Sequence, residues 1–93
     1  MTPEQRTLAR HALGLPNDRH TSYRNRFITG KGSLNHPAWA AMVAAGDAEC
    51  SSTNNPVNND YFWLTRQGAE KALNARETLC SEDFPNTTQA GAA

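Results

Sequence analysis

The sequence lacks most of the features that would assign a chemistry at once. Among its 93 residues only Cys50 and Cys80 are cysteines. Two cysteines do not make a disulfide framework, and we expect both to be unbridged thiols. A structural zinc site needs about four ligands at short, paired spacings. The separated cysteines and the scattered His11, His20 and His36 do not provide such a set.

Long apolar runs are also missing. No stretch approaches the roughly 18 apolar residues of a membrane span, and residues 1–15 lack the apolar core of a secretory signal peptide. A cytoplasmic location in a bacterial host cell is therefore expected. Hydrophobic residues make up only 38% of the chain but are clustered. This pattern predicts one domain at residues 1–80 and a disordered tail at 81–93, which is acidic and then small and polar.

The chain has no net charge, but its charges are unevenly spread. Residues 1–46 carry six basic and two acidic residues, a charge of +4, whereas residues 47–93 carry three and seven, a charge of −4. Such asymmetry indicates an anionic partner for the basic half, or simply attraction between the halves. Without a net positive charge, non-specific affinity for nucleic acid should be weak.

No catalytic set can be recognised. Ser33 near His36 lacks the positioned base and orienting group that a nucleophile needs, and so does Asp60. The Gly30-Lys31-Gly32-Ser33 stretch is not a phosphate-binding loop, because Asn25 stands where that motif needs its first glycine and no Ser or Thr follows the lysine. We therefore predict a protein that is not an enzyme and that uses no cofactor or metal.

The most informative stretch is Asp60–Leu73. Tyr61–Leu64 is a run of strand-forming residues, and Thr65 then provides a helix N-cap. The following helix is expected to continue to about Leu79. Gly68 in its first turn costs about 1 kcal/mol relative to alanine, which suggests a close approach to the aromatic strand or its hairpin.

Two further helices are predicted upstream. The first covers Pro3–Leu13, with a Thr2-x-x-Gln5 capping box before it and Gly14 as its C-terminal cap. The second covers about Pro37–Ala45, with an apolar side set by Trp39, Met42 and Val43 and with Gly46 as its cap.

The remaining segments are less regular. Ala48–Ser52 alternates like a weak strand, and the polar stretch Ser52–Asn59 is expected to form a long hairpin loop back to the aromatic strand. Residues 21–29 are ambiguous. The spacing of Tyr23 and Phe27 favours a short helix, whereas alternation and the Ile28-Thr29 pair favour a strand; we expect the helix.

The order of these elements resembles the winged-helix family. Val43–Gly46 matches its helix-ending turn, and Phe62–Gly68 matches the aromatic-x-Leu-Thr-x-x-Gly pattern that closes many such domains, with Leu73 one place late. The resemblance covers Pro37–Leu73. It implies an α+β, mainly helical domain with three helices, a two- or three-stranded β-hairpin wing and a C-terminal helix, and DNA binding as the common function.

The chain also resembles small uncharacterised phage and prophage proteins. The shared features are an Arg-Asn-x-aromatic segment, here Arg24–Phe27, and a Gly-x-Gly turn, here Gly30–Gly32. This resemblance implies a bacteriophage or mobile-element origin and no particular activity.

The chain departs from DNA-reading winged helices in two places. Residues 37–45 contain no Arg, Lys, Asn or Gln to read a base edge, and residues 52–59 contain no Arg or Lys to grip a phosphate. The densest basic cluster lies elsewhere, around Arg24 and Arg26. This cluster either contacts a phosphate or an acidic partner, or it is simply a solvated face of the protein.

Two functions remain open. The favoured one is a nucleic-acid-binding regulator or accessory protein that contacts double-stranded DNA. The alternative is a protein-interaction module that binds and modulates or inhibits a host protein, and a homodimer is compatible with both. The residues expected to contact either partner are Arg19, Arg24, Arg26, Lys31, Asn54, Asn55 and Asn58.

Overall fold

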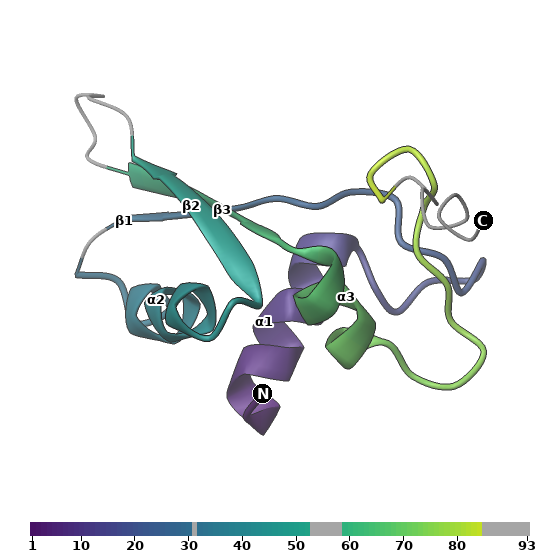
Figure 1. Cartoon of the computed structure of the whole chain (residues 1–93). Coiled ribbons are helices and arrows are strands. Elements are labelled where there is room, and N and C mark those ends of the chain that lie inside the picture. The colour runs from purple at the N-terminus through teal and green to yellow at the C-terminus, as the bar shows by residue number, and fades with distance from the viewer. Residues whose placement is uncertain (31, 53–58, 85–93) are drawn as a thin grey trace.

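The computed structural model describes residues 1–30, 32–52 and 59–84. In chain order its elements are α1 (Pro3–Leu13), β1 (Phe27–Gly30), α2 (His36–Ala44), β2 (Ala48–Ser52), β3 (Asn59–Leu64) and α3 (Arg66–Ala72). The strands pair antiparallel in the order β1-β3-β2. The helices lie on one side of this sheet (Figure 1). The described residues thus form a small α+β domain with three helices and a three-stranded antiparallel sheet.

The first helix is confirmed at both ends. The Thr2 hydroxyl accepts a hydrogen bond from the Gln5 backbone, and the Gln5 side chain accepts one from the Thr2 N–H, which completes the capping box. Gly14 adopts a left-handed conformation (φ 82°), and the Leu15 N–H donates to the Arg10 carbonyl at 2.9 Å. Glycine is the residue that reaches this conformation without a steric penalty, so the helix ends here.

The second helix is confirmed to within a residue at each end. Trp39 and Met42 are buried, as its apolar spacing predicts. Gly46 follows the last turn with φ 84°, and the Asp47 N–H donates to the Met42 carbonyl at 2.9 Å. This turn directs the chain into β2, whose predicted bounds are also confirmed.

The expected short helix within residues 21–29 is wrong. The segment is extended and ends in β1, where Phe27 pairs with Phe62 of β3. The backbone N–H groups of Tyr23 and Arg26 donate to carbonyls at the end of α1, so they need no helix of their own. The alternating pattern was the better guide. With this third strand and a shorter α3, the expectation of a mainly helical chain is not supported.

The last helix begins at the Thr65 cap as predicted but ends at Ala72, well before Leu79. Beyond α3, Glu77 binds the chain to α1. Arg10 donates to both carboxylate oxygens of Glu77, at 2.5 and 2.8 Å, and the Asn74 N–H donates to the same carboxylate at 2.6 Å. The segment after Ala72 can either continue the helix or make these contacts. It makes the contacts, so the helix ends at Ala72.

Part of the predicted tail packs on the domain. Phe84 is buried in the core, and its carbonyl accepts a hydrogen bond from Arg66 of α3 at 3.3 Å. Residues 85–93 lie outside the described residues. Cys50 and Cys80 are not bridged, as expected. No helix in the described part of the chain is long and apolar enough to cross a membrane.

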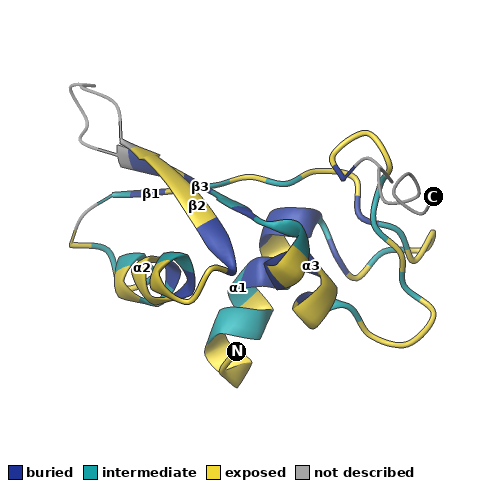
Figure 2. Ribbon diagram, in the orientation of Figure 1, coloured by how far each residue is buried: buried dark blue, intermediate teal, exposed yellow. Residues whose placement is uncertain are grey.

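A row of aromatic rings runs from exposed His11 on α1 into the core between sheet and helices. In order the rings are His11, Phe27, Trp39, Phe62 and His36, with neighbouring centroids 5.2–5.5 Å apart. Offset and edge-on pairs at these separations add to the stabilisation from burial alone. Figure 2 shows the buried residues concentrated where α1, α3 and the ends of β2 and β3 meet. The row joins α1, α2, β1 and β3 into one core.

The start of β2 is fastened to α3 through Asp47. Its carbonyl accepts the Thr65 N–H at 3.1 Å, and its buried carboxylate accepts hydrogen bonds from Gln67 at 2.8 Å and Lys71 at 2.9 Å. Burial alone would raise the pKa of Asp47, but the bonds from Gln67 and Lys71 outweigh burial and lower it. A Cβ on Gly68 would lie 1.9 Å from the Asp47 carbonyl oxygen. Gly68 therefore makes a close approach, as predicted. The residue that it approaches is Asp47, directly before the β2–β3 hairpin.

Gly68→Ala should lower the free energy of unfolding by more than about 3 kcal/mol, because the clash is with backbone and outweighs the roughly 1 kcal/mol gain in helix propensity. Gly46→Ala is the matched control. The space there is open, with Gln67 Nε2 3.5 Å away, but φ is positive, so the expected cost is about 1–2 kcal/mol. Urea unfolding of both variants tests this order, and equal losses would contradict the packing of α3 on Asp47.

Glu77 should make the protein acid-sensitive. Hydrogen bonds from Arg10 lower the pKa of Glu77 from 4.5 to about 2, against the opposing effect of burial. The pair stabilises the fold fully above pH 4.5, and this contribution is lost as the pH falls from 4.5 to about 2. Glu77→Gln should cost about 3 kcal/mol at neutral pH and flatten the decline in that window. Glu70→Gln, which removes an exposed pair with Arg66, should change neither. Urea unfolding across the window gives the result, and parallel curves for Glu77→Gln and the unmutated protein would contradict it.

Candidate functional site

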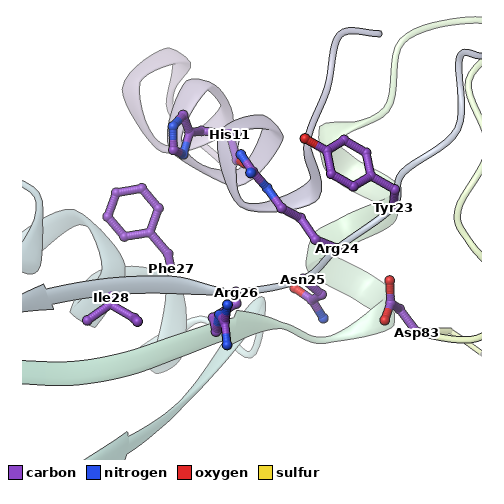
Figure 3. Close-up of a pocket in the computed structure, with 8 residues that line it drawn as sticks. All are labelled: His11, Tyr23, Arg24, Asn25, Arg26, Phe27, Ile28 and Asp83. Carbon is purple, nitrogen blue, oxygen red and sulfur yellow. The ribbon is translucent and has the colours of Figure 1, made fainter. Parts of the chain in front are cut away.

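The linker between α1 and β1 borders an open cavity of about 570 Å³. Two of the expected contact residues, Arg24 and Arg26, belong to it. Figure 3 shows the lining side chains, which come from α1, the linker, β1 and the segment after α3. They are His11, Tyr23, Arg24, Asn25, Arg26, Phe27, Ile28 and Asp83. Basic and aromatic groups therefore share one surface.

Asn25 sets the position of the linker. Its side-chain amide donates to the Leu64 carbonyl at 3.0 Å and its oxygen accepts the Leu64 N–H at 2.8 Å. These two bonds extend the pairing of β1 with β3 beyond the strand, with the Asn25 side chain taking the place of a backbone partner. Because Asn25 lies between Arg24 and Arg26 in the chain, these bonds also hold the backbone of both arginines beside the end of β3.

Arg24 is held against α1. Its guanidinium donates two hydrogen bonds to the His11 carbonyl, at 2.7 and 3.2 Å, and lies 5.3 Å from the centre of the Tyr23 ring. A cation at the carbonyl end of a helix is favourable, and so is one over an aromatic face. Arg24 therefore supports the site as well as adding charge to it. Tyr23 itself is 61% exposed, so its ring is open to a ligand.

Arg26 is the more available cation. It is exposed, and its side chain makes no hydrogen bond or ion pair with any described residue. In Figure 3 its side chain lies on the opposite side of β1 from His11 and the Phe27 ring. Among the residues that line the cavity, Asp83 carries the one carboxylate.

Arg19 lies outside this cavity. It lines a second one of about 540 Å³, together with Cys80 and with Tyr23, which borders both. The Arg19 backbone N–H donates to the Asn17 side chain at 2.9 Å, within the turn that follows α1. The four other expected contact residues, Lys31, Asn54, Asn55 and Asn58, lie outside the described residues.

Three cations elsewhere in the described chain are paired with carboxylates. The pairs are Arg10–Glu77, Lys71–Asp47 and Arg66–Glu70. Of these pairs, only Arg10–Glu77 joins the basic half of the chain to the acidic half. Arg19, Arg24 and Arg26, like Arg6 and Arg76, form no ion pair with a carboxylate among the described residues, although Asp18 lines the cavity of Arg19 and Asp83 that of Arg24 and Arg26.

The second helix offers little to a ligand. Its one polar side chain that could reach outward, His36, lies 2.7 Å from the buried Asp60 carboxylate. Its exposed positions are proline and alanine. No group of three or more potential metal-ligating side chains occurs among the described residues. The linker, rather than this helix, therefore carries the exposed charge.

Several residues of the cavity were not anticipated. His11, which is exposed on α1, was not among the expected contact residues, and neither was Tyr23. The interleaving of Tyr23 and Phe27 with arginines is a signal that could have identified them. Asp83 carried no signal, because it reaches the site through the tertiary fold.

No protein-family model, no curated protein and no solved structure matches the chain. The nature of its ligand must therefore be inferred from the chemistry of its surface.

The two cavity arginines should differ in their effect on stability. Arg24→Gln should cost about 1 kcal/mol, because it removes two charge-assisted hydrogen bonds and the contact with Tyr23. Arg26→Gln should change stability by less than about 0.5 kcal/mol, as expected for an exposed residue with no partner in the described part of the chain. Urea unfolding of both variants provides the comparison. A larger loss for Arg26→Gln would mean that Arg26 has a structural partner.

Proposed function

We propose that this protein is a non-enzymatic nucleic-acid-binding protein, a regulator or accessory factor of phage type. The observation that carries the proposal is the group of exposed arginines, without an ion pair among the described residues, beside the exposed ring of Tyr23. Guanidinium groups bind phosphate oxygens with two parallel hydrogen bonds, and an open aromatic ring can stack on a base. Arg26 would contact a phosphate directly, with Arg24 and Arg19 adding positive potential on either side of Tyr23.

A winged-helix-like reading of the fold has partial support. A helix leads into the β2–β3 hairpin and a helix follows it, which supports this reading; the strand order was not part of the expectation. The short helix expected before α2 is replaced by a strand, and α2 presents no base-reading side chain. The proposed contact is therefore through the linker and not through a helix in the major groove.

One observation favours a second candidate, a protein-interaction module acting on a host protein. Asp83 lies on the rim of the cavity, where its charge would repel a phosphate. A protein partner could pair an acidic group with Arg26 and a basic group with Asp83. A homodimer is compatible with both candidates.

The first test is fluorescence anisotropy with labelled random double-stranded and single-stranded DNA, at low and at physiological salt. Binding should weaken steeply with salt. Arg26→Gln should weaken it by about three- to tenfold and reduce the salt slope by about one unit, because one phosphate contact is lost.

Arg66→Gln is the matched control, since it removes the same charge from an arginine already paired with Glu70. It should leave binding within about twofold of the unmutated protein. Absence of binding to both nucleic acids at low salt would overturn the proposal and favour the protein partner. Equal losses in both variants would show that net charge, not this surface, controls binding.

A further inference from the structure

The face of the sheet turned away from the helices, here called the open face, has an unusual composition. Pairing places Ile28, Tyr61 and Ser51 side by side in one row across the three strands. The next row pairs Trp63 with Glu49. Ile28 is 44% and Tyr61 38% exposed, whereas Phe27 and Phe62 on the other face contact the buried Trp39. The open face thus presents large apolar and aromatic groups that no described element covers.

The open face is continuous with the arginine cavity. Ile28 belongs to both, since it lines the cavity and pairs across the sheet with Tyr61. Carrying the register of β1 and β3 back by two residues pairs Asn25 with Leu64, in agreement with their hydrogen bonds. The same register places Arg26 beside Trp63. The guanidinium of Arg26, which has no partner among the described residues, therefore lies at the edge of the aromatic surface.

Charge is polarised across the open face. Arg26 lies at the β1 edge, whereas Glu49 lies on β2 at the other edge, with its carboxylate accepting a hydrogen bond from Trp63 Nε1 at 2.8 Å. A polyanion on this surface would hold its phosphates along the β1 edge and direct its bases over β3. The hydrogen bond from Trp63 Nε1 to Glu49 also fixes the plane of the Trp63 indole beside Tyr61.

A single strand fits this arrangement better than a duplex does. In a duplex the flat faces of the bases are stacked on one another, so an aromatic side chain cannot reach them without unstacking. Duplex reading requires side chains that reach into a groove, which α2 does not supply. A single strand offers phosphates and free base faces together, and aromatic side chains on an exposed sheet next to a basic edge bind both.

We propose that the ligand is a single-stranded nucleic acid that crosses the open face, with one base stacked on Tyr61 and its phosphate held by Arg26. This inference rests on the proposed function and names the class of nucleic acid. Trp63 provides a second, more shielded stacking surface, and Tyr23 a third beyond the cavity.

The test compares labelled oligothymidine of about 12 nucleotides, within the usual footprint of one single-strand-binding module, with a duplex of the same length. Anisotropy titrations at low salt should show single-strand binding at least about tenfold tighter. Tyr61→Leu should weaken single-strand binding by about tenfold, the loss expected for one base–aromatic stack, and leave duplex binding unchanged. Tyr61→Phe, which keeps the ring, should bind like the unmutated protein. Thermal unfolding of all variants verifies that they are folded.

The outcomes separate this inference from the function on which it rests. Equal affinity for both forms, or no effect of Tyr61→Leu, would overturn the single-strand assignment while nucleic-acid binding stands. Absence of binding to either form would overturn both. If Tyr61→Leu and Tyr61→Phe fail alike, the hydroxyl group and not the stacked ring makes the contact, and the stacking geometry is wrong. Loss of single-strand binding in Arg26→Gln but not in Arg66→Gln would place the phosphate at the β1 edge.

Discussion

The backbone and the side chain of Asp47 hold together the end of α2, the start of β2 and the first turns of α3. Its N–H caps α2, its carbonyl receives Thr65, and its buried carboxylate binds two side chains of α3. These bonds bring α3 so close that only glycine fits at residue 68. A buried carboxylate is costly unless its oxygens are satisfied, so the arrangement is stable only as a whole. The sheet and the last helix consequently keep one relative position.

That fixed position is what allows the sheet to present a functional face. With all described helices on one side, the opposite side of the three strands stays uncovered, as antiparallel sheets permit. Asn25 then ties the linker to the end of β3, so the arginine surface and the open face share one rigid frame. Preorganisation of this kind lowers the entropic cost of binding a flexible ligand. The rigid core and the exposed groups are therefore parts of one arrangement.

Local signals in the sequence were sufficient for much of the fold. The capping box at Thr2, the apolar spacing around Trp39 and the Thr65 cap each depend on neighbours within a few residues, and they predicted helix starts correctly. The failures have long-range causes. Residues 21–29 extend because α1 satisfies their backbone, and α3 stops early because Glu77 finds Arg10. The linker arginines could be found as a cluster. The sequence does not show that Arg24 binds the His11 carbonyl while Arg26 binds none of the described residues, because this difference depends on the tertiary fold.

The two tryptophans occupy contrasting environments. Trp39 is fully buried between Phe27 and Phe62, and its indole N–H has no hydrogen-bond partner in the described part of the chain. Trp63 is half-buried on the open face and donates to Glu49. The two indoles therefore emit from different environments. Unfolding exposes both, whereas a ligand on the open face contacts Trp63 alone, so a Trp39→Phe variant would report occupancy of the sheet without an added label.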